Sequence, residues 1–369
     1  MRAGIYVHIP FCLGKCRYCS FNSIPYEAGL ARHYLDSLKK ETEGRLEGVE
    51  PTSIYIGGGT PTVLPEERLF GLLDVLRPEE GVEWTIEANP GTLAGLDMKR
   101  LRGLGVGRVS VGAQSFDPGL LRMLGRRHGP EDVAESVGRL GEAGFKNISV
   151  DLMYSLPGQT MGSWSDSLEA ALALGVGHIS IYDLTLEEGT PLHALVKSGR
   201  LTPPPETMQV EMYLMAVDIL EKAGFVRYEI SNFALPGLEC LHNMNYWSGG
   251  DCIGLGAGAH SHLSGIRSEN APGVREYTSA VLEGASPVLM AETLTKAELE
   301  REFIMLRLRR GEGLDPAEYL RRFGVGFMRR HGAPARRLAA SGHLEITPRS
   351  VRLTVKGALA GSAVTREFF

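Results

Sequence analysis

Six short apolar runs rich in β-branched residues recur through the first half of the chain, separated by amphipathic stretches with helical periodicity. Each run has the composition of a buried parallel strand, and the clearest helical stretches are 30–44, 130–144 and 164–175. Repeated βα units with right-handed crossovers predict an α/β fold, a partial (β/α)6 barrel. The runs are IYVHI (5–9), SIYIGG (53–58), EWTIEA (83–88), RVSVGAQ (108–114), NISVDLMY (147–154) and HISIYDLT (178–185).

The repeat breaks at KSGRLTPPPETM (197–208), because three consecutive prolines cannot continue a helix. We assign the barrel to 1–235, a connecting region rich in glycine and aromatic residues to 236–290, and a C-terminal domain to 291–369. Helical stretches followed by a short hairpin make this last part a winged-helix-like α+β module. Its many arginines permit a nucleic-acid interpretation, but arginine-rich helix surfaces are common, and we expect no nucleic-acid partner.

The composition narrows the class of protein. With 39 Lys and Arg against 44 Asp and Glu, the net charge is −5, which argues against a general attraction to nucleic acid or membrane. There is no secretory signal and no apolar run of about 18 residues. We therefore expect a cytoplasmic protein without an integral membrane segment, for which peripheral contact with a membrane acceptor stays open.

Three of the five cysteines, Cys12, Cys16 and Cys19, are crowded into HIPFCLGKCRYCSFNS (8–23). In a reducing compartment such crowding indicates metal ligation or catalysis. Soft thiolates select zinc, copper(I) or iron–sulfur clusters. A closed zinc site needs four ligands, whereas a [4Fe–4S] cluster on three cysteines leaves one iron open to a small molecule. We favour the cluster; zinc completed by His8 or a remote ligand, and simple redox thiols, are the alternatives.

Other polar and glycine-rich positions fall at the ends of the predicted strands. GGGTPT (57–62) follows the second run, and glycine lets backbone approach a ligand closely. Glu87, Gln114 and Asp151 lie at or near the ends of the third, fourth and fifth runs. Each could instead cap a helix or satisfy backbone. We favour a binding site, because equivalent strand ends of a barrel converge on one mouth.

The cysteine motif resembles that of the radical S-adenosylmethionine (SAM) superfamily. The resemblance implies that SAM chelates the open iron, where an electron cleaves it to methionine and a 5′-deoxyadenosyl radical. YVHIPFC, YIGGGTPT, EANP, GAQSF, LGRRH and DLMYSLPGQ resemble the coproporphyrinogen dehydrogenase-like branch over nearly the whole chain. By this resemblance the SAM region is lined by Tyr6, Tyr18, Gly58, Gly59, Thr60, Glu87, Gln114, Arg126 and Asp151.

Two features depart from the dehydrogenases of that branch. They carry a further cysteine two residues past the third cluster ligand, where this chain has Phe21, and a long N-terminal extension before the first ligand, which here is already Cys12. Both departures resemble the sister group of haem chaperones.

A second motif agrees with this assignment. CLHNMNYWSGGDCIGLGAGAHS (240–261) matches the H-N-x-x-Y-W pattern of the chaperones with His242, Asn243, Tyr246 and Trp247. An imidazole can ligate haem iron, and aromatic rings can cover a porphyrin face. The alternative is a hydrogen-bonded loop histidine beside core aromatics. Cys240 and Cys252 flank the motif and could also ligate haem, although a small buried apolar role is commoner for a solitary cysteine. Weaker candidates still are His260 and His262.

The resemblance therefore implies a haem chaperone that binds haem, a [4Fe–4S] cluster and SAM and transfers haem to an acceptor apoprotein. A reductant such as flavodoxin or ferredoxin would be a further partner. The rival is an enzyme, an oxygen-independent coproporphyrinogen III dehydrogenase that decarboxylates propionates oxidatively. A radical enzyme with an unrelated substrate is a third alternative, and no catalytic residue is assigned.

Overall fold

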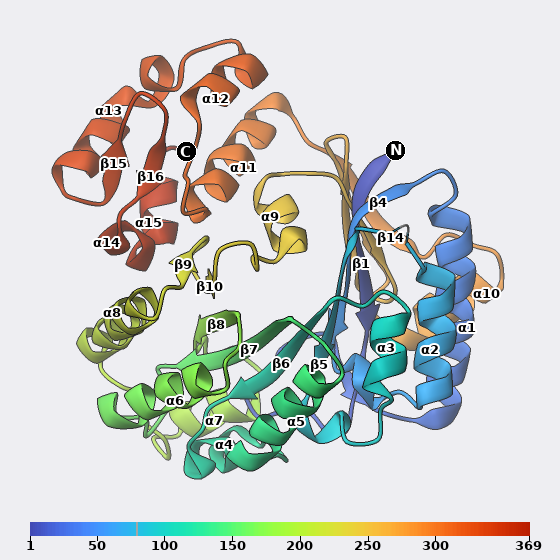
Figure 1. Cartoon of the computed structure of the whole chain (residues 1–369). Helices are drawn as coiled ribbons and strands as arrows, with labels where there is room; N and C mark the ends of the chain where they lie inside the picture. Colours follow the sequence, from blue (N-terminus) through green and yellow to red (C-terminus); the bar gives the residue numbers. More distant parts are fainter. Residues whose placement is uncertain (79) are drawn as a thin grey trace.

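In the computed structural model, which describes residues 1–78 and 80–369, the six expected strands form the centre of one twelve-stranded sheet. They run parallel and adjacent in chain order (Figure 1). The predicted α/β fold built on a parallel sheet is therefore confirmed. These strands are β1 (Arg2–Ile9), β4 (Glu50–Gly58), β5 (Glu83–Ala88), β6 (Arg108–Gln114), β7 (Asn147–Tyr154) and β8 (His178–Asp183).

The sheet continues beyond both ends of this parallel block. Next to β1 comes β11 (Cys252–Leu255), which is parallel to it, and then β12 (His260–Leu263), β13 (Ile266–Asn270) and β14 (Val288–Thr293), which are antiparallel. Beyond β8, the antiparallel strands β10 (Asn232–Ala234) and β9 (Val226–Arg227) form the other edge. The barrel is open, since β14 and β9 do not pair with each other.

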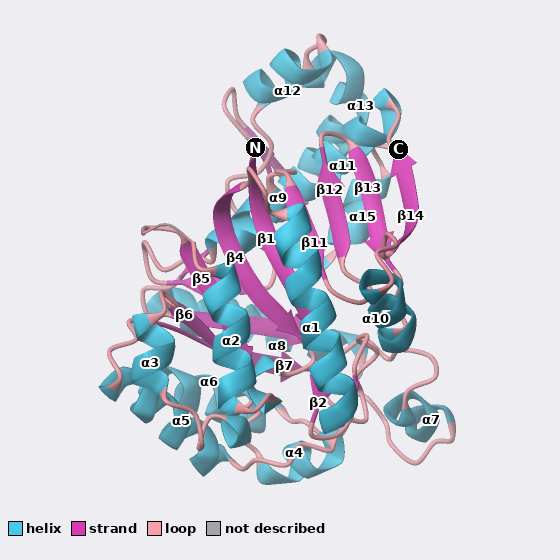
Figure 2. Cartoon of the chain, turned by 90° about the vertical axis from the view of Figure 1, so that its right-hand side faces the viewer, coloured by secondary structure: helices cyan, strands magenta, loops and turns pink. Residues whose placement is uncertain are grey.

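Helices cover one face of this sheet, with α1 and α2 lying over β1 and β4 in Figure 2. Alternate strand residues such as Ile5, Val7 and Ile9 are fully buried in the core that they share with these helices. The helices are α1 (Ala28–Arg45), α2 (Glu66–Leu76), α3 (Met98–Gly103), α5 (Pro130–Glu142), α6 (Met161–Ala173), α8 (Glu206–Lys222) and α10 (Val274–Leu282). Two short helices, α4 (Pro118–Leu124) and α7 (Pro191–Lys197), instead pack against the cysteine loop in a separate apolar cluster.

Short elements at the strand ends shape the loops of the site. The brief strands β2 (Phe11–Cys12) and β3 (Ile24–Pro25) pair with each other, and β3 directly follows the cysteine motif. Single 3₁₀ turns, η1 (Pro61–Val63) and η2 (Pro90–Thr92), follow β4 and β5. No helix within the described part of the chain has the length and apolar character that a membrane span requires.

The C-terminal part has its own hydrophobic core, which includes Phe303, Tyr319, Phe327 and Val351. Three helices precede a two-stranded hairpin, the order expected of a winged-helix-like module. A capping box between Thr295 and Glu298 fixes the first helix start. The elements are α11 (Lys296–Arg309), α12 (Pro316–Phe323), α13 (Phe327–Ala340), β15 (Leu344–Ile346), β16 (Val351–Leu353), α14 (Val355–Leu359) and α15 (Gly361–Arg366), with α9 (Leu241–Trp247) lying before them.

Candidate cluster and SAM site

The cysteine loop is carried by the carboxyl end of β1. Cys12 ends β2, and Cys16 and Cys19 follow in a turn in which the Cys19 amide donates to the Cys16 carbonyl at 3.2 Å. The Arg17 amide donates to the carbonyl of Leu124, the last residue of α4, at 2.9 Å. All three thiols are free and partly exposed. The loop therefore holds three accessible thiols at one end of the parallel block.

His8 does not complete a tetrahedral zinc site with these thiols. Its Nδ1 lies 3.0 Å from the Tyr6 hydroxyl and its Nε2 lies 2.8 Å from the Asn22 carbonyl oxygen. Burial lowers the pKa of its imidazole, and both ring nitrogens already have partners. Among the described residues no group of three or more His, Cys, Asp or Glu side chains, the three thiols included, is arranged to hold a metal ion. The assignment of the three thiols to a cluster with an open iron stays a prediction from their spacing.

The glycine loop after β4 packs against the cysteine strand at van der Waals distance. A Cβ on Gly58, which has φ of 108°, would lie 2.4 Å from the His8 ring, and one on Gly59 would lie 2.6 Å from the Phe11 carbonyl oxygen. The Gly59 and Thr60 amides donate to Ile9 and Phe11 carbonyls, both at 2.8 Å. Thr60 Oγ1 then donates to Cys12 Sγ at 3.7 Å. Only glycine fits these positions, so the loop is locked beside the first thiol.

Two partly buried carboxyl groups, Glu87 and Asp151, lie on neighbouring parts of the sheet, on β5 and β7. Glu87 accepts hydrogen bonds from the Tyr55 hydroxyl at 2.7 Å and the Gly58 amide at 3.1 Å, and burial raises its pKa to about 7. Asp151 accepts from the Ser110 hydroxyl at 3.0 Å, and burial also raises its pKa. A cation brought between such groups would favour their charged forms. The ammonium and sulfonium of SAM are cations of this kind.

Arg126 and Asn89 connect the glycine loop to the second thiol. Arg126 donates through Nη2 to Asn89 Oδ1 and through Nη1 to Cys16 Sγ at 3.6 Å. Asn89 Nδ2 donates to Thr60 Oγ1 at 2.8 Å. Hydrogen bonds thus join Cys12, Thr60, Asn89, Arg126 and Cys16 in one chain. Sequence reasoning missed Asn89, although it stands two residues after Glu87 in the EANP motif.

The remaining predicted SAM residues, Tyr6, Tyr18 and Gln114, lie on β1, in the cysteine loop and at the end of β6. Gln114 ends β6 at a bulge, with φ of 69°, and Asp151 pairs with Gly112 across β6 and β7. The ring of Tyr6 stacks on that of Tyr55 with centroids 6.3 Å apart. Tyr18 packs on a small apolar cluster beneath the cysteine loop. Sequence reasoning also missed Tyr55. The only sequence signal for it is the alternation of side chains along its strand, which places it on the same face as Ser53 and Gly57.

The H-N-x-x-Y-W motif forms α9, which lies toward the opposite ends of the strands. His242 is buried, its Nδ1 lies 2.9 Å from Ser53 Oγ, and its ring lies 5.3 Å from that of Tyr55. Burial lowers its pKa to about 4. Its amide donates to Glu83 at the start of β5 at 3.0 Å. The histidine therefore anchors α9 to the sheet.

The rest of this motif points away from the anchor. Tyr246 is half exposed, and its ring meets that of Trp247 edge-on with centroids 5.0 Å apart. The guanidinium of Arg309 lies 4.5 Å above the Trp247 ring, which ties α9 to α11. Asn243 is partly buried. Cys240 donates to Glu83 at 3.6 Å, and burial raises its pKa to about 12.

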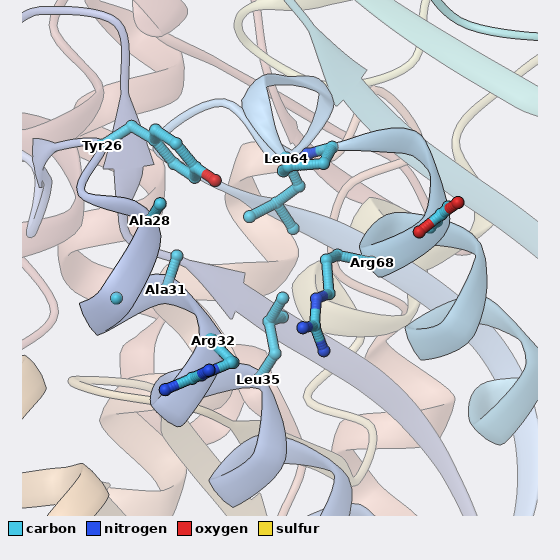
Figure 3. Close-up of a pocket in the computed structure, with 10 residues that line it drawn as sticks. Tyr26, Ala28, Ala31, Arg32, Leu35, Leu64 and Arg68 are labelled. Carbon is cyan, nitrogen blue, oxygen red and sulfur yellow. The ribbon is translucent and has the colours of Figure 1, made fainter.

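A separate cavity of about 400 Å³ opens between α1 and the start of α2 (Figure 3). Tyr26, Arg32, Leu35, Leu64 and Arg68 are among its lining residues. It lies on the helical side of the sheet, and none of the predicted cluster, SAM or haem residues lines it. It is therefore distinct from the site at the strand ends.

Comparison with known proteins places the chain among relatives of similar length. The model of the radical SAM superfamily matches residues 6–171, and that of the HemN C-terminal domain matches 294–360. "Heme chaperone HemW" of Bacillus subtilis is 37% identical over 98% of both chains. The protein of that name from Lactococcus lactis is 36% identical over 98% of this chain and 96% of its own.

Among solved structures, coproporphyrinogen III oxidase (HemN) from Escherichia coli superposes with a TM-score of 0.84. The match covers 99% of this chain and 89% of the other, at 23% sequence identity. At that identity the similarity establishes a shared fold, including the C-terminal domain.

Proposed function

This chain belongs to the HemW family of the radical SAM superfamily, and from that premise we propose that it is a haem chaperone. It binds haem, a [4Fe–4S] cluster and SAM, and hands haem to an acceptor protein in the cytoplasm. The observation that carries the proposal is the 37% identity over 98% of both chains to a protein named as a heme chaperone.

The residues at the strand ends fit the two cofactors. Cys12, Cys16 and Cys19 would hold the cluster, which supplies one-electron chemistry when bound. Glycine-loop backbone lies beside Cys12, and the partly buried carboxyls of Glu87 and Asp151 accept hydrogen bonds from hydroxyl and amide groups. Glu87 would accept a hydrogen bond from the SAM ammonium, and Arg126 would keep the Cys16 thiolate and the Asn89 amide in place.

For haem, the proposal assigns the motif on α9, His242, Asn243, Tyr246 and Trp247, to the binding region. Tyr246 and Trp247 offer aromatic surface outside the main core, and the contact of Arg309 with Trp247 links this region to the C-terminal domain. Haem bound here would be away from the cysteine loop, since α9 contacts the starts of β4 and β5 through Ser53 and Glu83.

The direct test of the proposal is a haem titration followed by transfer. Protein reconstituted anaerobically is titrated with haem, and the Soret band is followed; saturation near one haem per chain is expected. The loaded protein is then mixed with apomyoglobin as the acceptor probe, and haem should move to it. A flat Soret titration would refute the chaperone assignment.

The dehydrogenase alternative is tested by product analysis. Phe21 stands where the dehydrogenases have a further thiol, and its side chain is 67% exposed at the rim of the cysteine loop. The reconstituted protein is incubated with excess SAM, dithionite and coproporphyrinogen III beside a dehydrogenase that turns over. We expect no protoporphyrinogen; many turnovers would make this chain an enzyme.

A further inference from the structure

A groove of about 340 Å³ lies between the antiparallel extension of the sheet and helix α11. In Figure 2 the strands β12, β13 and β14 form the edge of the sheet, and α11 lies behind them. We call this site the His262 groove and define it by Tyr246, Cys252, His262, Arg267, Met290 and Met305. Its volume falls in the range of small-molecule sites, about 300–1,000 Å³.

Strand register explains why these side chains share one face. Cys252 pairs with His262, which pairs with Arg267 on the next strand. His260 pairs with Glu269, which pairs with Met290. Because paired residues project to the same side of a sheet, the two rows form one wall of the groove. Met305 and Glu302 of α11 form the opposite wall.

The groove contains buried polar atoms that lack partners. His262 Nε2 and Glu302 Oε2 are both buried without a hydrogen-bond partner among the described residues. The other oxygen of Glu302 accepts from Arg267 Nη2 at 2.5 Å. Buried unpartnered groups are rare in folded proteins and cost free energy, so they call for a ligand or water. A ring nitrogen with a free lone pair can serve as a metal ligand.

Apolar side chains are exposed around these atoms. The exposed fractions are 52% for Tyr246, 55% for Met290 and 39% for Met305, far above those of core residues of the same type. All three line the same groove. An exposed apolar patch around a concave site indicates a partner with apolar faces. A flexible thioether adapts its shape to such a partner.

The charged side chains of the groove determine which charge the centre of a bound ligand can carry. Glu269, Glu292 and Glu302 line it, against Arg267, which already pairs with Glu302 and Glu292. This balance disfavours an anionic group inside and favours a cationic centre. His, Cys, Met and Tyr, which are the side-chain types that ligate haem iron, all line the groove. A metalloporphyrin joins apolar faces to a cationic metal, and its carboxylates would point to solvent.

We propose that the haem cargo binds in the His262 groove, with His262 Nε2 as the protein ligand of the iron. Tyr246, Met290 and Met305 contact the porphyrin, and His242 holds the helix that carries Tyr246. This inference rests on the proposed chaperone function. It also separates the cargo from the cluster, because Cys252 pairs with Gly4 near the start of β1, whereas the thiols follow its end.

The test compares haem with metal-free protoporphyrin IX in equilibrium titrations. His262→Ala should shift the Soret maximum and weaken haem binding about tenfold or more, while protoporphyrin affinity changes less than about twofold. Met305→Trp, which fills the groove, should weaken both porphyrins. His33→Ala on exposed α1 is the matched control and should leave both unchanged.

The outcomes separate this inference from the proposed function. If the unmodified protein binds no haem, both fail. If it binds haem and His262→Ala keeps the same Soret maximum and affinity, the ligand assignment is wrong, and a shift with His260→Ala instead would move it to that residue. Unchanged binding in Met305→Trp would overturn the groove itself. Far-UV circular dichroism verifies folding of each variant.

Discussion

The site at the strand ends and the His262 groove use the inner side of one sheet in opposite ways. At the strand ends, backbone hydrogen bonds join the glycine loop directly to the cysteine strand, and added atoms would collide with backbone or rings. In the groove, an imidazole nitrogen and a carboxylate oxygen are buried beside exposed thioethers and have no hydrogen-bond partner in the part of the chain that the structure describes. The first site is built before its ligand arrives, whereas the second is completed by its ligand.

This difference has a functional consequence. A preformed site holds a resident cofactor, and its residues tolerate little change. A site with unpartnered atoms and exposed thioether side chains gains more from binding, and it also releases its ligand when a better partner competes. Such an arrangement suits a cargo that must leave.

The largest expected effect is the loss of the cluster in Cys16→Ala. With two thiols left, anaerobic reconstitution should yield little or no iron–sulfur absorbance, measured with iron and sulfide analysis. Haem affinity should change less than about twofold, because the groove shares no residue with the cysteine loop. Leu13→Ala in the same loop is the control that should keep its cluster. Parallel loss of haem binding in Cys16→Ala would break the separation of the two sites.

The free-energy cost of a Gly→Ala substitution at each site tests how rigidly that site is packed. Gly58→Ala combines φ of 108° with a contact 2.4 Å from the His8 ring, and should lower the free energy of unfolding by about 3 kcal/mol or more. Gly249→Ala, in the groove with φ of 63° and its nearest neighbour Leu306 at 3.8 Å, should cost only about 1 kcal/mol. Urea unfolding measures both values. Equal costs would show that the two sites do not differ in rigidity.

Alanine substitutions of His242 and His262 should have different effects: the first should lower the stability of the fold, and the second should weaken haem binding. His242→Ala loses the Ser53 hydrogen bond and ring packing, and should cost about 2 kcal/mol at pH 7.5 with an unchanged Soret maximum. His262→Ala should cost less than about 0.5 kcal/mol, since its Nε2 has no partner to lose. A larger stability cost at His262, or a Soret shift at His242, would reverse the assigned roles.

The pH dependence of this pair follows from the pKa of His242, which burial lowers to about 4, below the value of about 6.5 in unfolded chains. Between pH 6.5 and 4 the unfolded chain binds a proton that the native imidazole does not. The stability that neutral His242 contributes is fully present above pH 6.5 and is lost on acidification. The advantage of the unmodified protein over His242→Ala should therefore shrink from about 2 kcal/mol to near zero by pH 5. A constant difference across this range would contradict the lowered pKa.

The two sites also differ in how far sequence could predict them. The β-branched runs and the cysteine spacing are local patterns, so the parallel strands were predicted within a few residues, and the cluster and SAM residues could be proposed. Tyr55 and Asn89 were missed because a partner such as Glu87 or Arg126 is fixed only by strand register and loop packing. The groove joins α9, the four strands β11 to β14 and α11, and no local pattern predicts that His262 and Met305 would line the same groove. The same lack of tertiary information left the burial of His242 undetermined.

The smallest expected effect compares two asparagines, one at each site. Asn89→Ala removes the hydrogen bonds to Thr60 and Arg126, worth about 1 kcal/mol in net terms, so SAM affinity of the reconstituted protein should fall about fivefold. Asn245→Ala removes the bond to the Asp251 carbonyl at 3.0 Å, which fixes the turn into β11, and should weaken haem by a similar factor without affecting SAM. Calorimetric titration of both ligands on both variants measures the four values. If either variant lowers both affinities, the two sites are coupled through the sheet, and binding of SAM would then regulate release of the cargo.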